Sequence, residues 1–150
     1  RTIILSLFVL CISFSTRAQQ NDRREKIKAL KVSFITEKLA LTENEAQKFW
    51  SIYNTYEENT SEIRHKELRS IGKEIKEKSN TLTDAESEVL LDKLIAAEKK
   101  LHNENTQLII KLKKIISPKK IILLKAAEED FKRKLFDEYR KKRHEAKKKN

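Results

Sequence analysis

Few side chains of this 150-residue chain have the types and spacing that catalysis requires. The three histidines, His65, His102 and His144, fall in three separate predicted helices, and the single cysteine, Cys11, lies in an apolar N-terminal run. The chain has one glycine, whereas phosphate-binding loops and dinucleotide-binding fingerprints each need several. We therefore expect no enzymatic activity and no cofactor.

Metal binding has one local candidate in the sequence. His102 follows Glu98 by one helical turn, a spacing at which two side chains can share one ion. No second histidine or cysteine joins them, and zinc sites use three or four protein ligands. We expect His102 to be a solvated surface side chain and predict no metal site.

Residues 1–18 have the three parts of a secretory signal peptide. Arg1 is positively charged, residues 3–14 are mostly apolar, and a stretch of small residues ends at Ala18. The apolar run is shorter than the roughly 20 residues that span a bilayer, which argues against an uncleaved anchor. The bulky residue before Cys11 argues against a lipoprotein signal. We expect cleavage after Ala18 and a periplasmic mature chain without a thiol.

The positive charge is concentrated near the C-terminal end of the sequence. Residues 111–150 contain 16 Lys and Arg against 6 Asp and Glu, with basic runs at Arg140–Arg143 and Lys147–Lys149. In a cytosolic protein such runs would suggest nucleic acid. An exported protein meets anionic lipid headgroups or acidic unfolded polypeptides instead, so we expect no nucleic-acid partner. A charged tail that only solubilises the chain is the simpler explanation.

Three capping signals predict where helices begin. In two of them a threonine is followed three residues later by glutamate, so each side chain can bond the other residue's backbone N–H. In the third, a serine cap precedes a proline at the first helical position. An apolar residue stands directly before each cap. The signals are Leu41-Thr42-Glu43-Asn44-Glu45, Leu82-Thr83-Asp84-Ala85-Glu86 and Ile116-Ser117-Pro118.

Apolar residues at spacings of three and four indicate amphipathic helices. They predict four helices, at about 22–39, 43–78, 84–114 and 118–147. Short connections between long helices favour antiparallel hairpins. We predict an all-α fold of four amphipathic helices in elongated antiparallel hairpins, forming a single domain over residues 19–150.

Several features refine the predicted packing. The cluster Phe49, Trp50, Tyr53 and Tyr56 is expected to pack in the core against the first and fourth helices, with an exposed groove for polypeptide as the alternative. Gly72 either marks a bend or is an unremarkable helical glycine. The predicted core faces run from Ile27 to Ile35, Ala46 to Ile75, Leu90 to Ile115 and Ile121 to Tyr139. Acid-to-base pairs four residues apart, such as Asp130–Lys134, predict a solvated face of the last helix.

The order of these features resembles the Spy/CpxP family of periplasmic proteins, whose LTxxQ motif occurs twice. Leu41–Glu45 matches the first copy with Glu in place of Gln, and Ile116–Lys120 stands where the second copy would be. Lys120 is not an acceptor and cannot close a capping box, whereas Leu82–Glu86 fits the pattern but opens the third helix. The Phe-Trp-x-x-Tyr sequence from Phe49 is similar to small exported proteins of Bacteroidetes-type bacteria, described as sensors linked to ECF sigma factors.

This resemblance implies a four-helix protomer that pairs into a cradle-like homodimer and binds unfolded polypeptides without ATP. The alternative role is a regulatory accessory that binds an envelope sensor protein of an ECF sigma factor or two-component system. A heavy-metal sensor is a lesser alternative, because the chain has no methionine and only scattered histidines. A weak contact with an anionic membrane surface is also expected. The candidate client-binding residues are Phe34, Ile35, Lys111, Lys113, Lys132, Arg133 and Arg140.

Overall fold

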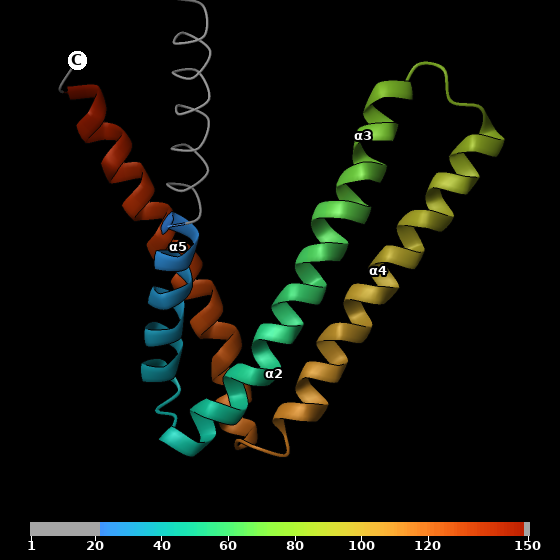
Figure 1. Ribbon diagram of the computed structural model, residues 1–150. Helices are drawn as coiled ribbons and strands as arrows, with labels where there is room; N and C mark the ends of the chain where they lie inside the picture. Colours follow the sequence, from blue (N-terminus) through green and yellow to red (C-terminus); the bar gives the residue numbers. More distant parts are fainter. Residues whose placement is uncertain (1–21, 149–150) are drawn as a thin grey trace, which may run out of the picture. The chain divides into compact units, whose positions relative to one another are not determined.

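The computed structural model describes residues 22–148 of the chain, and the expected signal peptide lies outside them. In the described range every regular element is helical and none is a strand, which confirms the all-α prediction. No helix of this range has the length and apolar character needed to cross a membrane. The elements are a helix over residues 22–38, α2 (Glu43–Glu62), the π-helical segment η1 (Ile63–Leu68), α3 (Arg69–Lys78), α4 (Asp84–Leu112) and α5 (Pro118–Lys148) (Figure 1).

The described residues divide into two compact units, and the single domain over residues 19–150 stays a prediction. Of the residues that the structure describes, unit 1 comprises 22–40 and 123–148, and unit 2 comprises Leu41–Ile122. The boundary crosses α5, so the first turn of this helix belongs to unit 2 and the remainder to unit 1.

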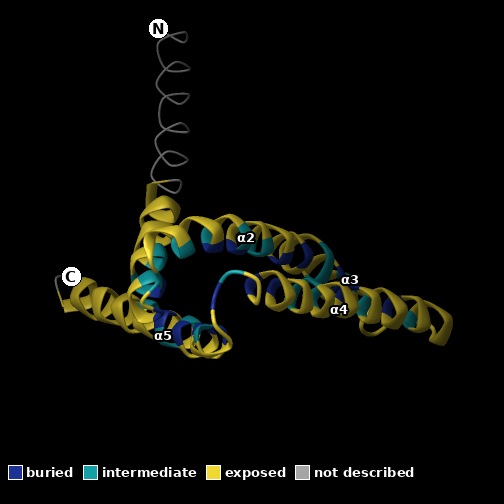
Figure 2. Cartoon of the chain, turned by 90° about the horizontal axis from the view of Figure 1, so that it is seen from below, coloured by how far each residue is buried: buried dark blue, intermediate teal, exposed yellow. Residues whose placement is uncertain are grey.

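Unit 2 is an antiparallel hairpin in which α2, η1 and α3 run along α4. Figure 2 shows the buried positions of these helices along the line where they meet. Ile63, Ile71, Leu90 and Ala97 form a buried cluster within this line. Because two long helices share one apolar seam, the predicted hairpin is confirmed here. Polar contacts also join α4 to the first arm of the hairpin, which consists of α2, η1 and α3. They are Tyr56 Oη–Asn105 Oδ1 at 2.8 Å, Asn59 Nδ2–Glu104 Oε2 at 3.1 Å, Lys100 Nζ–Glu67 Oε2 at 2.8 Å and Lys93 Nζ–Glu74 Oε2 at 3.6 Å.

The predicted helix over residues 43–78 is interrupted by η1, at a position that the sequence analysis did not single out. In a regular α-helix Ile63 and Leu68, five residues apart, would point to different sides. A π-helical turn closes i→i+5 hydrogen bonds and brings such residues nearly into line. Both side chains accordingly pack in the same cluster. Gly72 lies in regular α3, and a Cβ added there would meet no atom within 4 Å.

Unit 1 is a pair of antiparallel helices, residues 22–38 beside the later part of α5 (Figure 1). Ala40 ends the first of these helices with φ 45°, in the left-handed region that usually takes glycine. The Phe34 and Phe131 rings pack with their centroids 5.6 Å apart. The buried residues of the unit are Ile35, Leu39, Leu124, Ala127 and Phe131.

The predicted core faces extend too far at the helix ends. Ile27, Leu30, Ile75 and Tyr139 are between 36 and 57% exposed. Apolar spacing predicts which side of a helix can be buried, but burial also needs a partner that continues alongside. In unit 1 the buried positions of α5 end at Phe131, and every residue from Phe136 to Lys148 is exposed.

The aromatic cluster of α2 is mostly buried, as predicted, while its packing against the first and fourth helices stays a prediction. Phe49 and Tyr53 are almost fully buried, and their rings stack with centroids 5.3 Å apart. Trp50 is half-buried and meets both rings edge-on. The hydroxyl of Tyr56 donates to Asn105 of α4, so the cluster contacts the third predicted helix, which was not expected from the sequence.

Candidate binding surfaces

The two predicted capping boxes are both formed. At the start of α2 the backbone N–H of Thr42 donates to Glu45 Oε2 at 2.9 Å, and the N–H of Glu45 donates to the threonine Oγ1 at 3.3 Å. Thr83 and Glu86 make the same reciprocal pair at the start of α4. Each box satisfies N–H groups that the first turn of a helix leaves without partners.

The start of α5, the third predicted cap, makes a contact that was not predicted from the sequence. Ser117 caps α5 as predicted, since its Oγ accepts from the backbone N–H of Lys120 at 3.4 Å. The ammonium of Lys120 then donates to Glu45 Oε2 at 2.7 Å. Lys120 therefore ties the start of α5 to the capping box of α2, instead of closing a box of its own. One signal for this contact was present in the sequence: Glu45 and Lys120 stand at the same position of two related motifs and carry opposite charges.

This junction also changes the acidity of its carboxylate. The hydrogen bond from Lys120 lowers the pKa of Glu45 below its ordinary value of 4.5, and the Thr42 N–H adds to the effect. At the other box the Thr83 N–H is the main cause that lowers the pKa of Glu86. Both carboxylates are acceptors in every contact described, so the motif residues stabilise the starts of α2 and α4.

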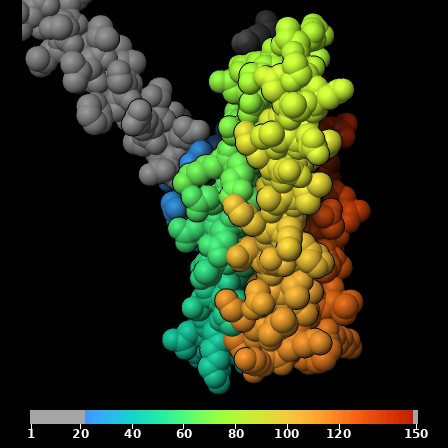
Figure 3. All heavy atoms as spheres, turned by 90° about the vertical axis from the view of Figure 1, so that its right-hand side faces the viewer, coloured from blue at the N-terminus to red at the C-terminus, as the bar shows by residue number. Residues whose placement is uncertain are grey.

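Unit 2 displays a row of apolar side chains on α4 that we name the α4 apolar stripe: Leu91, Ile95 and Ile109. Positions 91, 95 and 109 fall on one helical face because they are four and fourteen residues apart. Leu91 and Ile95 are 56 and 63% exposed, so the row lies on the surface and not in the seam. His102 and Lys113 continue the same spacing. Figure 3 looks onto the side of unit 2 along which α4 runs.

Unit 1 combines an aromatic ring with cations. The Lys38 and Lys134 ammonium groups lie 5.5 and 5.4 Å from the Phe34 ring centroid, within range of cation–π attraction. The predicted Asp130–Lys134 pair is wrong, because Asp130 pairs with Arg133 while Lys134 turns to the ring. A shallow hollow on this surface is lined by Phe34, Lys38, Asp130, Arg133, Lys134, Asp137, Glu138 and Lys141.

The predicted client-binding residues are only partly brought together. Phe34 and Arg133 line the same hollow, whereas Ile35 is fully buried and cannot touch a partner while the helix pair is formed. The side chain of Ile35 lies one helical step from Phe34, on the face that packs inward. Exposed positions are held by the cations Lys111 and Lys113 of unit 2 and Lys132, Arg133 and Arg140 of unit 1.

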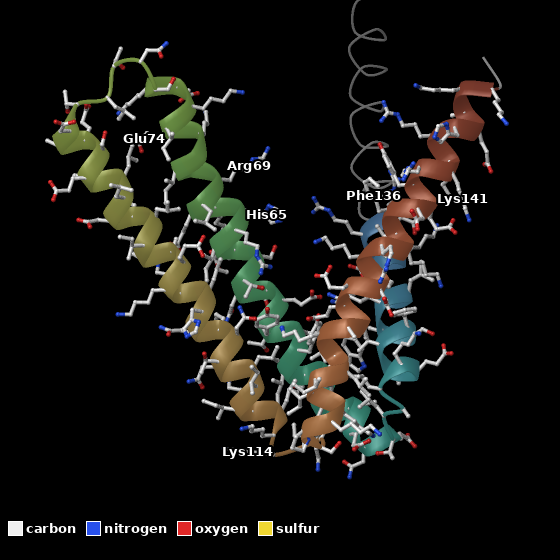
Figure 4. The ribbon with its side chains drawn as sticks, turned by 180° about the vertical axis from the view of Figure 1, so that it is seen from behind. His65, Arg69, Glu74, Lys114, Phe136 and Lys141 are labelled. Carbon is white, nitrogen blue, oxygen red and sulfur yellow. The ribbon has the colours of Figure 1, made fainter. Side chains whose placement is uncertain are left out.

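No three metal-binding side chains gather at one place among residues 22–148. Figure 4 shows that His65 and Arg69 project from the side of the first arm away from α4, while Glu74 lies between α3 and α4. Lys78 and Lys93 form ion pairs with Glu74, and the hydrogen bond from Lys78 is the main cause that lowers the pKa of Glu74.

Comparison of the chain with protein-family models, curated proteins and solved structures found no match.

Proposed function

We propose that this protein is an exported, ATP-independent binding protein that shields unfolded or aggregation-prone polypeptides. The observation that supports the proposal most directly is the α4 apolar stripe. Large apolar side chains in a row are costly to leave in water, and such rows mark surfaces that bind apolar partners. An unfolded polypeptide offers apolar groups at irregular intervals, which apolar side chains spaced along one face of a helix can meet in several registers.

Charge supports the same role. Lys113 lies on the face of the stripe just beyond the end of α4, and Lys111, two residues earlier, is exposed on another side of the helix. Cations beside an apolar row attract acidic segments before any apolar contact forms, which raises association rates. The attraction is screened over about 8 Å at physiological salt, so association should slow as salt is added.

The test compares two substitutions on the same helix. Ile95→Ser removes the most exposed residue of the stripe, whereas Val89→Ser removes a side chain of similar exposure, 54%, that lies off the stripe. Light scattering of a chemically unfolded client, diluted without ATP, should show suppression by the natural protein and the Val89 variant. The Ile95 variant should suppress aggregation less. Surface substitutions of this kind change stability by less than about 0.5 kcal/mol, so both variants should fold.

Unchanged client aggregation at stoichiometric protein would contradict the proposal. The regulatory role, in which one folded envelope sensor protein is the partner, would then be the better explanation. Export is tested separately by cell fractionation. Recovery of a shortened chain beginning at Gln19 in the periplasmic fraction is expected, and a full-length chain in the cytoplasm would contradict export.

A further inference from the structure

The last part of α5 carries a row of cations and aromatic rings that lies apart from the α4 apolar stripe. We name it the α5 cationic stripe. Apart from Tyr139 and Arg140, which are adjacent, successive members are three or four residues apart, so they share one broad face of the helix. The acidic residues of the same segment, Asp137, Glu138 and Glu145, fall outside that face. The stripe consists of Lys132, Phe136, Tyr139, Arg140, Arg143 and Lys147.

The stripe is open to its surroundings along its whole length. Phe136 and Tyr139 are 60 and 54% exposed, and all residues from Phe136 to Lys148 are exposed. The Arg140 guanidinium lies 5.9 Å from the centroid of the Phe136 ring. In Figure 4 the Phe136 and Lys141 side chains leave α5 on different sides, so the aromatic face and the mixed-charge face are distinct.

We propose that the α5 cationic stripe docks on the surface of a lipid bilayer that contains anionic phospholipids. A helix with basic residues and aromatic rings along one face can lie in the plane of the interface. The cations then meet the negative surface potential while the rings enter at headgroup depth. Phe136, Arg140, Arg143, His144 and Lys147 also line a hollow along this helix, and the phosphate of a headgroup has the charge that its cations would bind.

The shape of the segment favours a plane over an acidic polypeptide. A peptide held by charge in one register needs a groove with two walls, unlike an unfolded client that meets apolar side chains in several registers. Residues 136–148 form a single helix that is exposed on all sides. A flat anionic surface needs no second wall, because all members of one helical face can touch it together. The segment therefore fits a bilayer better than a polypeptide.

Co-sedimentation of the full chain with vesicles tests the proposal. Vesicles of phosphatidylcholine mixed with phosphatidylglycerol should bind the protein more tightly than vesicles of phosphatidylcholine alone, and added salt should weaken the difference. Arg140→Glu/Arg143→Glu should weaken binding to the anionic vesicles by about tenfold or more, since each basic residue near the surface contributes. The matched variant Lys141→Glu/Lys148→Glu has the same net charge but reverses cations outside the stripe. Its loss should be at most about threefold, because those charges lie across a helix about 10 Å wide and are screened.

A local readout separates this contact from any binding by the apolar run of residues 3–14, which all variants share. In a Trp50→Phe/Phe136→Trp chain the only tryptophan reports on the stripe, and its emission should shift to the blue with anionic vesicles alone. Equal losses in the two charge variants, an unshifted emission, or tight binding to polyglutamate without any preference for anionic vesicles would each overturn the proposal. Circular dichroism checks that both variants keep their helices.

Discussion

Units 1 and 2 are both pairs of antiparallel helices, yet they are held together differently. Unit 2 adds polar contacts between its two arms to an apolar seam, and capping boxes begin both of its long arms. Unit 1 depends on a short apolar core around Phe131, and the last turns of α5 extend beyond that core. The difference indicates that unit 2 is the more firmly joined pair, while unit 1 presents an open helix end.

Emptying the core of each unit in turn should show whether the two units unfold separately. Phe131→Ala and Phe49→Ala should each cost about 3–5 kcal/mol, because a large cavity is left in an apolar core. Hydrogen exchange should show that the first variant loses protection in residues 22–38 and in α5, whereas the second loses it in α2. Loss of protection throughout the chain from the Phe131 variant alone would show that the two units do not differ in this way.

Removing one polar contact tests how far such contacts join the arms of unit 2. Tyr56→Phe deletes the hydroxyl that donates to Asn105 Oδ1 and keeps the ring. We expect a loss of about 0.5–1.5 kcal/mol in the free energy of unfolding, measured by urea denaturation. Tyr139→Phe is the control, because it deletes the hydroxyl of an exposed tyrosine and also keeps the ring. An equal loss in the Tyr139 variant would contradict the assignment.

Unit 1 should gain stability from one backbone change. Ala40 has φ 45°, a backbone conformation that is strained for a residue with a Cβ and unstrained for glycine. Ala40→Gly should raise the free energy of unfolding by about 1 kcal/mol. Ser33→Gly, at an exposed position within the helix, should instead lower it by about 1 kcal/mol. Destabilisation by both substitutions would show that the left-handed conformation of Ala40 is not strained.

The junction at Glu45 predicts a pH dependence. Its pKa is lowered in the folded chain, so below 4.5 the unfolded chain takes up more protons and stability falls with falling pH. Glu45→Gln keeps an acceptor for the Thr42 N–H but loses the ion pair with Lys120. We expect a shallower fall in melting temperature on acidification than in the natural protein. Glu86→Gln is the matched control at a box without such a pair. Identical melting temperatures for the two variants near neutral pH would contradict a role for Lys120.

The sequence predicted the helices and their starts because caps and apolar spacing are local signals. Thr42, Thr83 and Ser117 begin helices as expected. The π-helical segment was missed although Ile63 and Leu68 are five residues apart, because an apolar face was expected only at spacings of three and four. The Lys120–Glu45 contact joins residues 75 apart in sequence, and only the folded chain brings them together. Ile35 was offered as a surface residue because a single helix does not show which of two neighbouring apolar residues its partner covers.

The central claim is that the α4 apolar stripe contacts unfolded polypeptide. Its most direct test places a photo-crosslinking amino acid at Ile95 or, as control, at Val89, and illuminates each protein with an unfolded client. We predict a crosslinked adduct at position 95 that disappears when the client is folded first, and little adduct at position 89. Equal adducts at both positions, or none with the unfolded client, would contradict the claim.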